Sequence, residues 1–460
     1  MVTRPISSTL SHQTGKTAAH NPQNNKTNVG YIPQFLAKTA ECNPQNCALF
    51  LLFQRFLVFL HHSNEGAKNM KKLIDAYYQR LGLIKTDFVR YLHDKIPWQN
   101  NLNMILGCRG VGKTTMMLQH ILINHEEDTS LYVTSDHPYF TSTTLLELAE
   151  YFYHHGGQHL YIDEVHKYPG WSREVKEIHD TYPTLQLTLS GSSMIDIIRG
   201  LEVDLSRRAL VYRLEPMSFR EYVNFSQGTN IQPKTIDIVL SGKIQDIPEM
   251  EHPLQLFSDY LATGNYPFFG EPGYQQRLDA VVSQTLEVDI PNQVKIALPT
   301  ARKLKKLMYV LAQSTPFKPN YSNLGRTLEM DRTMVAEVMY YLERAGLLRL
   351  LREDDDIMDR FTKVEKVYLN NTNLCYSLCD NEPDKGTIRE TFFFSQVAIG
   401  HRVSASLVAD FIVDGHTFEV GGKNKTRKQV ADLKDAYVVK DDTLYPYLNI
   451  IPLWMFGLLY

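Results

Sequence analysis

One short segment of this sequence, Asn103–Thr115 (NMILGCRGVGKTT), constrains the fold more than any other. An apolar run leads into a glycine-rich turn with the pattern GxxxxGK[ST], and a helix-forming stretch, TTMMLQHILI, follows at once. A strand, a loop and a helix in this order form a phosphate-binding loop, in which glycines let backbone N–H groups point at the phosphates of a nucleotide. The segment therefore predicts a parallel α/β fold that binds a nucleotide.

The residues of this loop have separate expected roles. Lys113 should reach the β- and γ-phosphates of ATP, and the hydroxyl of Thr114 should bind Mg²⁺. The N-terminus of the following helix adds a partial positive charge beside the phosphates. Cys108 is interpreted as a passive small residue, with an oxidation-sensitive thiol as the alternative. The expected nucleotide-binding residues are Gly107, Cys108, Arg109, Gly110, Val111, Gly112, Lys113, Thr114 and Thr115.

A second apolar segment, HLYIDE, ends in two carboxylates, Asp163 and Glu164. Asp163, at the end of this predicted strand, should hold Mg²⁺ through a water molecule, and Glu164 should polarise the attacking water. An acidic pair after a strand is often only a solvated turn. Its place after a phosphate-binding loop favours the catalytic interpretation.

Two later motifs complete the candidate site. The segment LQLTLSGSS predicts a buried strand that ends in Ser190 and Ser192. These hydroxyls could sense the γ-phosphate or simply cap the next helix. The motif DLSRRA then places Arg207 and Arg208 before another strand. An arginine here could neutralise transition-state charge, within one subunit or across an interface, or could form a structural salt bridge.

Five strand-like segments, near residues 104, 132, 161, 187 and 211, alternate with helical ones, as in a parallel α/β sheet. The motifs GCRGVGKTT, YIDEVHKYPGW, LSGSS, DLSRRA and EPMSFREY, in this order, resemble those of bacterial and archaeal AAA-type ATPases with a C-terminal domain of unknown function. The later segments YLATGNYP and PLWMFGLLY fit the same family, so the resemblance covers residues 70–460. It implies the strand order 5-1-4-3-2 and ATP and Mg²⁺ as ligands. It also implies the catalytic roles given above for Lys113, Thr114, Asp163, Glu164 and Arg208.

Residues 1–69 differ from the rest of the chain. They hold six basic and two acidic residues, a net charge of +4, so the −3 of the whole chain leaves −7 for residues 70–460. The apolar run ALFLLFQRFLVFL is too short to span a bilayer and contains Arg55. We interpret 1–69 either as a disordered tail or as an extension wrongly assigned before a true start at Met70. Neither a targeting segment nor a disulfide framework is recognisable, which predicts a cytoplasmic protein without a membrane partner.

The remaining chain predicts four parts: a P-loop AAA-type ATPase domain (70–230), a helical lid (231–300), a winged-helix-like domain (301–370) and an α+β nuclease-like domain (371–460). In the third part, a helix at Asn323–Leu328, a turn, a helix at Arg332–Ala345 and a strand follow in winged-helix order. The segment Asp331–Ala345 has two arginines against three acids, and Glu353–Asp359 carries five acids. This charge would repel duplex DNA, so a packing or partner-binding role is favoured over DNA binding.

The last part contains a predicted hairpin, Val408–Val420, closed by the turn residues Asp414 and Gly415. Its register pairs Val413 with His416 and, further along, Asp410 with Glu419. Two carboxylates opposite each other need a cation or a proton between them. Glu390, on the preceding helix, could supply a third oxygen.

Glu390, Asp410 and Glu419 resemble the acids of the restriction-endonuclease-like fold. That fold has a lysine two residues after the second acid, where this chain has Gly421, and the nearest candidate is Lys423. An inactive relic is therefore favoured over an active nuclease.

The function expected from the whole sequence is Mg²⁺-dependent ATP hydrolysis that drives a conformational change of the C-terminal domains on an unknown protein partner or a second copy of the chain. Three alternatives remain: an ATP-dependent DNA-processing or nuclease protein of a mobile or defence element, a nucleotide-dependent switch with little hydrolysis, and a non-catalytic transcription regulator, which the acidic segment Glu353–Asp359 disfavours.

Overall fold

The computed structural model describes residues 66–192, 204–244, 247–291, 298–314, 316, 318–353, 363–379, 381–422, 433 and 435–460. Everything below concerns these residues. The predictions made for the N-terminal tail, for the acidic segment 354–359 and for Lys423 lie outside them.

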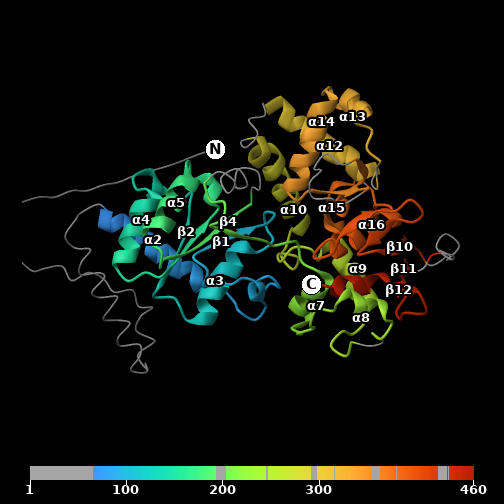
Figure 1. The fold of residues 1–460 in the computed structure, drawn as a ribbon, viewed down its shortest axis with the longest axis horizontal. Helices are drawn as coiled ribbons and strands as arrows, with labels where there is room; N and C mark the ends of the chain where they lie inside the picture. Colours follow the sequence, from blue (N-terminus) through green and yellow to red (C-terminus); the bar gives the residue numbers. More distant parts are fainter. Residues whose placement is uncertain are drawn as a thin grey trace, which may run out of the picture. The chain divides into compact units, whose positions relative to one another are not determined.

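A five-stranded parallel sheet forms the first part of the fold (Figure 1). Its strand order is β2-β3-β4-β1-β5, which read from the other edge is the predicted order 5-1-4-3-2. The predicted α/β fold is therefore confirmed. Apolar residues run almost without interruption along β1, as expected for a parallel strand that is covered on both faces. The strands are β1 (Leu102–Leu106), β2 (Ser130–Thr134), β3 (His159–Asp163), β4 (Gln186–Gly191) and β5 (Leu210–Arg213).

Helices surround this sheet. The first of them begins at Gly66, and the Met70 side chain is buried in the core. A capping box fixes the start of another helix, because Thr144 and Glu147 each accept a hydrogen bond from the other's backbone N–H. The helices are α2 (Gly66–Leu81), α3 (Lys113–Asn124), α4 (Leu145–His154) and α5 (Trp171–Thr181).

The middle of the chain is helical, as the sequence predicts for the lid. It includes a π-helix, η6, that continues directly from α10. The elements are α7 (Phe219–Gln227), α8 (Ile236–Leu240), α9 (Pro253–Thr263), α10 (Tyr274–Gln284) and η6 (Thr285–Asp289).

Three helices and an antiparallel strand pair follow in the predicted order. The elements are α12 (Leu298–Ser314), α13 (Tyr321–Leu328), α14 (Arg332–Arg344), β6 (Leu348–Arg352) and β7 (Val364–Leu369). The winged-helix assignment itself stays a prediction.

A second sheet closes the chain, with strands in the sequential order β8 to β12. Its first three strands are antiparallel neighbours, whereas β10, β11 and β12 run parallel. The elements are α15 (Thr372–Leu378), α16 (Lys385–Val397), β8 (Val403–Ala405), β9 (Phe411–Val413), β10 (His416–Gly421), β11 (Ala436–Lys440), β12 (Ile450–Pro452) and the 3₁₀ helix η8 (Leu453–Leu458).

The hairpin of β9 and β10 has the predicted register near its turn. Val413 pairs with His416, and the ladder continues as far as Phe411 and Phe418. One step further, the backbone N–H of Asp410 donates to the carbonyl oxygen of Phe418 (3.1 Å), so the predicted Asp410–Glu419 ladder pair does not form. The regular pairing stops one residue earlier than the hairpin pattern implies.

Two hydrophobic cores organise the described residues. One contains the first sheet, its helices and buried residues of α10 and α12–α15, and the other joins α7–α9 to α16, the second sheet and η8. Residues from the predicted lid therefore pack with the C-terminal sheet. In the described part of the chain, no helix has the length and apolar character needed to cross a bilayer.

Candidate nucleotide-binding site

The glycine-rich loop lies between β1 and α3, as its sequence predicts. Gly110 and Gly112 have φ values of 82° and 98°, in the left-handed region that side chains disfavour. The ammonium group of Lys113 donates to the carbonyl oxygens of Gly107 (2.9 Å) and Cys108 (3.1 Å). The lysine therefore curls back over its own loop, at the N-terminal end of α3.

Asp163 at the end of β3 accepts hydrogen bonds from several directions. Thr114 Oγ1 donates to its Oδ2 over 2.5 Å, and the hydroxyl of Tyr132 donates to the same oxygen over 2.6 Å. Its other oxygen accepts from Ser190 Oγ and from the backbone N–H of Glu164. Burial, together with the neighbouring Asp163, raises the pKa of Tyr132 and keeps that phenol a neutral donor.

This arrangement fits a Mg²⁺ ion. The hydroxyl of Thr114, in the first turn of α3, and the carboxylate of Asp163, at the end of β3, are hard oxygen donors, which Mg²⁺ prefers. The structure thus brings together the two residues predicted as magnesium ligands, although they come from separate segments of the chain.

Glu164 has an unusual backbone and a well-defined set of neighbours. Its φ of 53° lies in the left-handed region, where a side chain adds strain. Its Oε2 accepts a hydrogen bond from Ser192 Oγ (3.0 Å) and lies 3.6 Å from Nε2 of His166. Burial lowers the pKa of His166, and the nearby Glu164 opposes this only in part. Both predicted sensor serines therefore contact the acidic pair.

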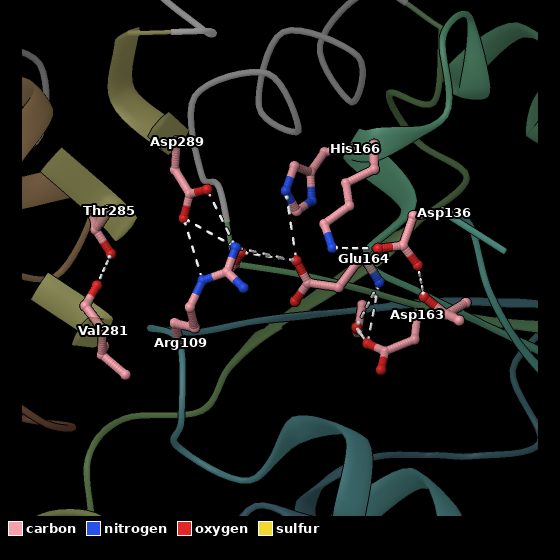
Figure 2. Close-up of polar contacts among 12 residues, drawn as sticks. Arg109, Asp136, Asp163, Glu164, His166, Val281, Thr285 and Asp289 are labelled. Atoms are coloured by element: carbon pink, nitrogen blue, oxygen red, sulfur yellow. Dashed lines mark hydrogen bonds and ion pairs between the residues drawn. The ribbon is translucent and has the colours of Figure 1, made fainter. Parts of the chain in front are cut away.

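Arg109 in the phosphate loop lies between two carboxylates (Figure 2). Its NH2 atom is 3.1 Å from Oδ1 and 3.2 Å from Oδ2 of Asp289, and its Nε is 3.4 Å from the same Oδ2. The same NH2 atom is 4.0 Å from Oε2 of Glu164. Asp289 is the last residue of the π-helix, and no local sequence pattern predicts this contact.

Two further residues that sequence reasoning missed shape the loop. Arg90 is 4% exposed and pairs with Glu221, which is 1% exposed, through Nε–Oε1 (2.9 Å) and NH2–Oε2 (3.1 Å). Its NH1 atom donates to the carbonyl oxygen of Val111 inside the phosphate loop. The ring of Phe268 covers Gly110 so closely that a Cβ built there would lie 2.9 Å from its Cε1.

The predicted arginines are not brought to the phosphate loop. Arg208 forms an exposed ion pair with Asp180 on α5, with two contacts of 2.9 Å. Arg207 is exposed and has a φ of 71°. Among the described residues, neither hydrogen-bonds to the loop. The structure thus shows the salt-bridge alternative for Arg208 within this one chain.

Cys108 is half-buried and contacts the C-terminal half of the chain. Its Sγ lies 3.5 Å from the carbonyl oxygen of Gly346, in the turn that leads from α14 to β6. Burial raises the pKa of the Cys108 thiol. A thiol with a raised pKa is a poor nucleophile near neutral pH, which favours the passive interpretation of this cysteine.

A second polar cluster occupies the C-terminal part. Lys366 on β7 lies 3.1 Å from both Glu390 Oε2 and Asp410 Oδ1, and the hydroxyl of Tyr368 donates to Glu390 Oε2 (2.7 Å). Burial and the Asp410 carboxylate raise the pKa of Glu390. Burial disfavours the charged form of Lys366, but the two acids outweigh this and raise its pKa. Glu419, the third predicted acid, is 3% exposed.

Comparisons with known proteins agree with this fold. Residues 99–223 match the family described as an AAA domain, and residues 254–385 match a domain of unknown function, DUF8612. Together with the sheet order and the phosphate loop, these matches support an AAA-type ATPase domain followed by a domain of unknown function. The restriction-endonuclease-like assignment stays a prediction.

Two uncharacterised proteins of Methanocaldococcus jannaschii are similar in sequence. One, MJ1637, is 24% identical over 269 residues, which are 54% of this chain and 56% of that protein. The other, MJ1544, is 22% identical over 172 residues, 36% of each chain. The chain thus spans little more than half the length of the first relative and about a third of the second.

Solved structures give weaker likenesses. AMPPCP-bound DnaA from Aquifex aeolicus has a TM-score of 0.28 at 15% identity, covering 55% of this chain and 84% of that one. The Hsp104–ADP complex of S. cerevisiae has the same TM-score and identity, covering 58% and 40%. Similarity at this level carries no conclusion about activity.

Proposed function

We propose that this chain hydrolyses ATP with Mg²⁺ and uses the reaction to move its C-terminal parts on a partner. The observation that supports this most strongly is the Thr114–Asp163 hydrogen bond, 2.5 Å long, beside Lys113 and Glu164. It joins the first residues of α3 to the end of β3, where a nucleotide's terminal phosphates and their metal ion would lie.

Each side chain has a defined task in this proposal. Thr114 and Asp163 would hold Mg²⁺, which when bound neutralises charge on the phosphates. Lys113 would leave the carbonyl oxygens of Gly107 and Cys108 and bind phosphate oxygens instead. Glu164 would orient a water molecule and accept its proton. Ser190 and Ser192, which already contact the acidic pair, would keep it in position.

The partner in this proposal is a protein, either a second copy of the chain or another molecule. DNA is disfavoured because an acid neutralises a nearby arginine in this region: Glu343 on α14 pairs with Arg352 on β6 at 2.7 Å. Arg207, exposed near the edge strand β5, is available to a neighbouring subunit, so a role in trans belongs to this proposal.

The test is nucleotide binding and turnover with the full chain. Lys113→Ala should weaken the binding of Mg²⁺-ADP by at least about tenfold, because a charged hydrogen bond to phosphate contributes about 1.5–3 kcal/mol. Turnover should be measured with and without duplex DNA. Tight binding without turnover would favour the nucleotide-dependent switch, and strong stimulation by DNA would favour the DNA-processing alternative. Unchanged binding by Lys113→Ala would refute the proposed site.

A second candidate function rests on Lys366. The sequence lacks a lysine two residues after Glu419, but β7 supplies an ammonium group to Glu390 and Asp410 from another strand. A cavity of about 550 Å³ lies beside this cluster and is lined in part by Lys366 and Asp410. A metal-dependent nuclease site is therefore a candidate, although Lys366 also neutralises the acids as an inactive relic would.

DNA cutting with Mn²⁺ or Mg²⁺ separates these two interpretations. If the site is a nuclease, wild type cuts DNA and Asp410→Asn does not, while both fold equally well. If wild type never cuts, the relic interpretation stands and the nuclease candidate is refuted.

A further inference from the structure

The ion pair between Arg109 and Asp289 links the phosphate loop to the helical lid. The two side chains meet as a fork, with three N–O distances between 3.1 and 3.4 Å, and they are 180 residues apart in the chain. Their side chains are 27% and 12% exposed. The pair is thus well formed but open to solvent at one side, where a ligand can compete for it.

The guanidinium of Arg109 also lies near the proposed reaction centre. It is 4.0 Å from Oε2 of Glu164, the carboxylate that would orient the attacking water (Figure 2). That water must lie beside the γ-phosphate, so a γ-phosphate in contact with Lys113 and near Glu164 also lies within reach of Arg109. This step rests on the proposed ATPase function.

A γ-phosphate and Asp289 would compete for the same cation. A phosphate accepts the two parallel N–H groups of a guanidinium in the way a carboxylate does, and it carries more negative charge. ADP has no phosphate at this position. The exchange of Arg109 from Asp289 to the nucleotide therefore depends on the presence of a third phosphate.

The lid contacts the phosphate loop at two places, through Phe268 near the start of α10 and through Asp289 at the end of η6. Phe268 covers Gly110, and its ring centroid lies 5.3 Å from that of Tyr274, the first residue of α10. Asp289 closes the π-helix at the other end of the same helical segment. π-helices occur mostly as single-turn insertions in α-helices and are frequent at functional sites. Release of Asp289 would free one end of this segment while Phe268 holds the other.

The same segment reaches the C-terminal part of the chain. The hydroxyl of Tyr274 donates to Oδ1 of Asn373 (2.5 Å), and Ser377 on α15 donates to Asp279 on α10. Movement of α10 would therefore displace α15, and both helices lie within residues 254–385, which match the domain of unknown function.

We propose that Asp289 is a positioning residue that holds Arg109 until a nucleoside triphosphate binds, so that the lid distinguishes ATP from ADP. In the resting protein, Arg109 is shared between Asp289 and Glu164. With a triphosphate bound, Arg109 contacts the γ-phosphate, Asp289 loses its partner, and the end of the lid is released.

The experiment compares two nucleotides on the full chain. Calorimetry with Mg²⁺ gives the Kd of ADP and of the non-hydrolysable analogue AMPPNP for wild type and Asp289→Asn. Removing the competing charge should raise the ratio of Kd(ADP) to Kd(AMPPNP) by roughly fivefold, a size expected for a partly exposed ion pair. Glu287→Gln is the matched control, because Glu287 lies in the same π-helix but pairs with Lys305. Its ratio should stay at the wild-type value.

A double-variant cycle and hydrogen exchange complete the test. In an Arg109→Gln background, Asp289→Asn should no longer change the ratio. In wild type, peptides covering residues 285–291 should exchange faster with AMPPNP than with ADP, a measurement that needs no variant. Equal exchange with both nucleotides, or an unchanged ratio in Asp289→Asn, overturns the proposal.

These outcomes are distinct from failure of the proposed function. If Lys113→Ala binds both nucleotides as wild type does, the nucleotide site itself is wrong. If Lys113→Ala loses binding while Asp289→Asn leaves the ratio unchanged, only the role of Asp289 is wrong.

Discussion

Replacing Arg90 with alanine should destabilise the fold and weaken nucleotide binding in the same variant. Arg90 and Glu221 are 4% and 1% exposed, so truncating the arginine leaves a buried carboxylate without its cation. Glu221 keeps its bonds to the backbone N–H groups of Tyr91 and Ser218, but these do not neutralise it. Breaking a buried ion pair from one side costs about 3–5 kcal/mol. Two carbonyl oxygens, of Val111 and Glu215, also lose their donor.

Equilibrium urea unfolding, followed by tryptophan fluorescence, measures this loss. Arg90→Ala should lower the free energy of unfolding by about 3–5 kcal/mol. Arg90→Ala with Glu221→Gln should recover part of it, because no buried charge then remains unpaired. ADP affinity should fall in both variants, since each loses the contact with the phosphate loop.

The matched control is Arg208→Ala, which breaks the exposed pair with Asp180. Exposed ion pairs contribute little, so this variant should unfold almost as wild type does. If Arg90→Ala is no less stable than Arg208→Ala, the buried pair does not hold the phosphate loop and our reasoning about this residue fails.

Three further predictions concern the loop itself. Gly110→Ala should lower ADP affinity, because φ is 82° there and a Cβ would lie 2.9 Å from Phe268. Adding Phe268→Ala should remove the steric contact but not the backbone strain, so measured ADP affinity should recover only in part. Burial raises the pKa of the Cys108 thiol, so its alkylation should be slow at pH 7, and the alkylation rate should level off at a higher pH than that of a free thiol. Fast labelling at pH 7 would contradict this. Thr114→Ala removes the hydroxyl that bonds Asp163, so turnover should need more Mg²⁺ to reach half its maximum, and an unchanged Mg²⁺ titration would exclude Thr114 as a ligand.

Local sequence patterns predicted those parts of the fold whose backbone conformation depends on residues adjacent in the chain. Gly110 and Gly112 fix the turn from β1 into α3, because both have a positive φ that few other residue types tolerate. Asp414 and Gly415 both adopt positive φ, at 47° and 88°, which is the two-residue turn that sets the register of β9 and β10. The resemblance to AAA-type ATPases supplied the strand order, which no local pattern contains.

The contacts that local patterns could not predict join distant segments. Arg109 and Asp289 are 180 residues apart, and Arg90 and Glu221 are 131 apart. Each partner looks like an ordinary charged residue in its own segment, and only the packing of η6 and α7 near the loop brings the charges together. The same holds for Lys366 on β7, which lies 3.1 Å from both Glu390 and Asp410 although its own segment gives no sign of either contact.

The most direct test of the central claim is phosphate release from Mg²⁺-ATP by the purified full chain, comparing wild type with Glu164→Gln. Removing a general base lowers turnover by roughly 10²–10⁴-fold, while the glutamine keeps the shape of the side chain and should leave ATP binding nearly unchanged. Turnover in wild type that is lost in Glu164→Gln, with binding retained, is the predicted result. Equal turnover in the two proteins, or none in wild type, would contradict an ATP-hydrolysing site built on Asp163 and Glu164.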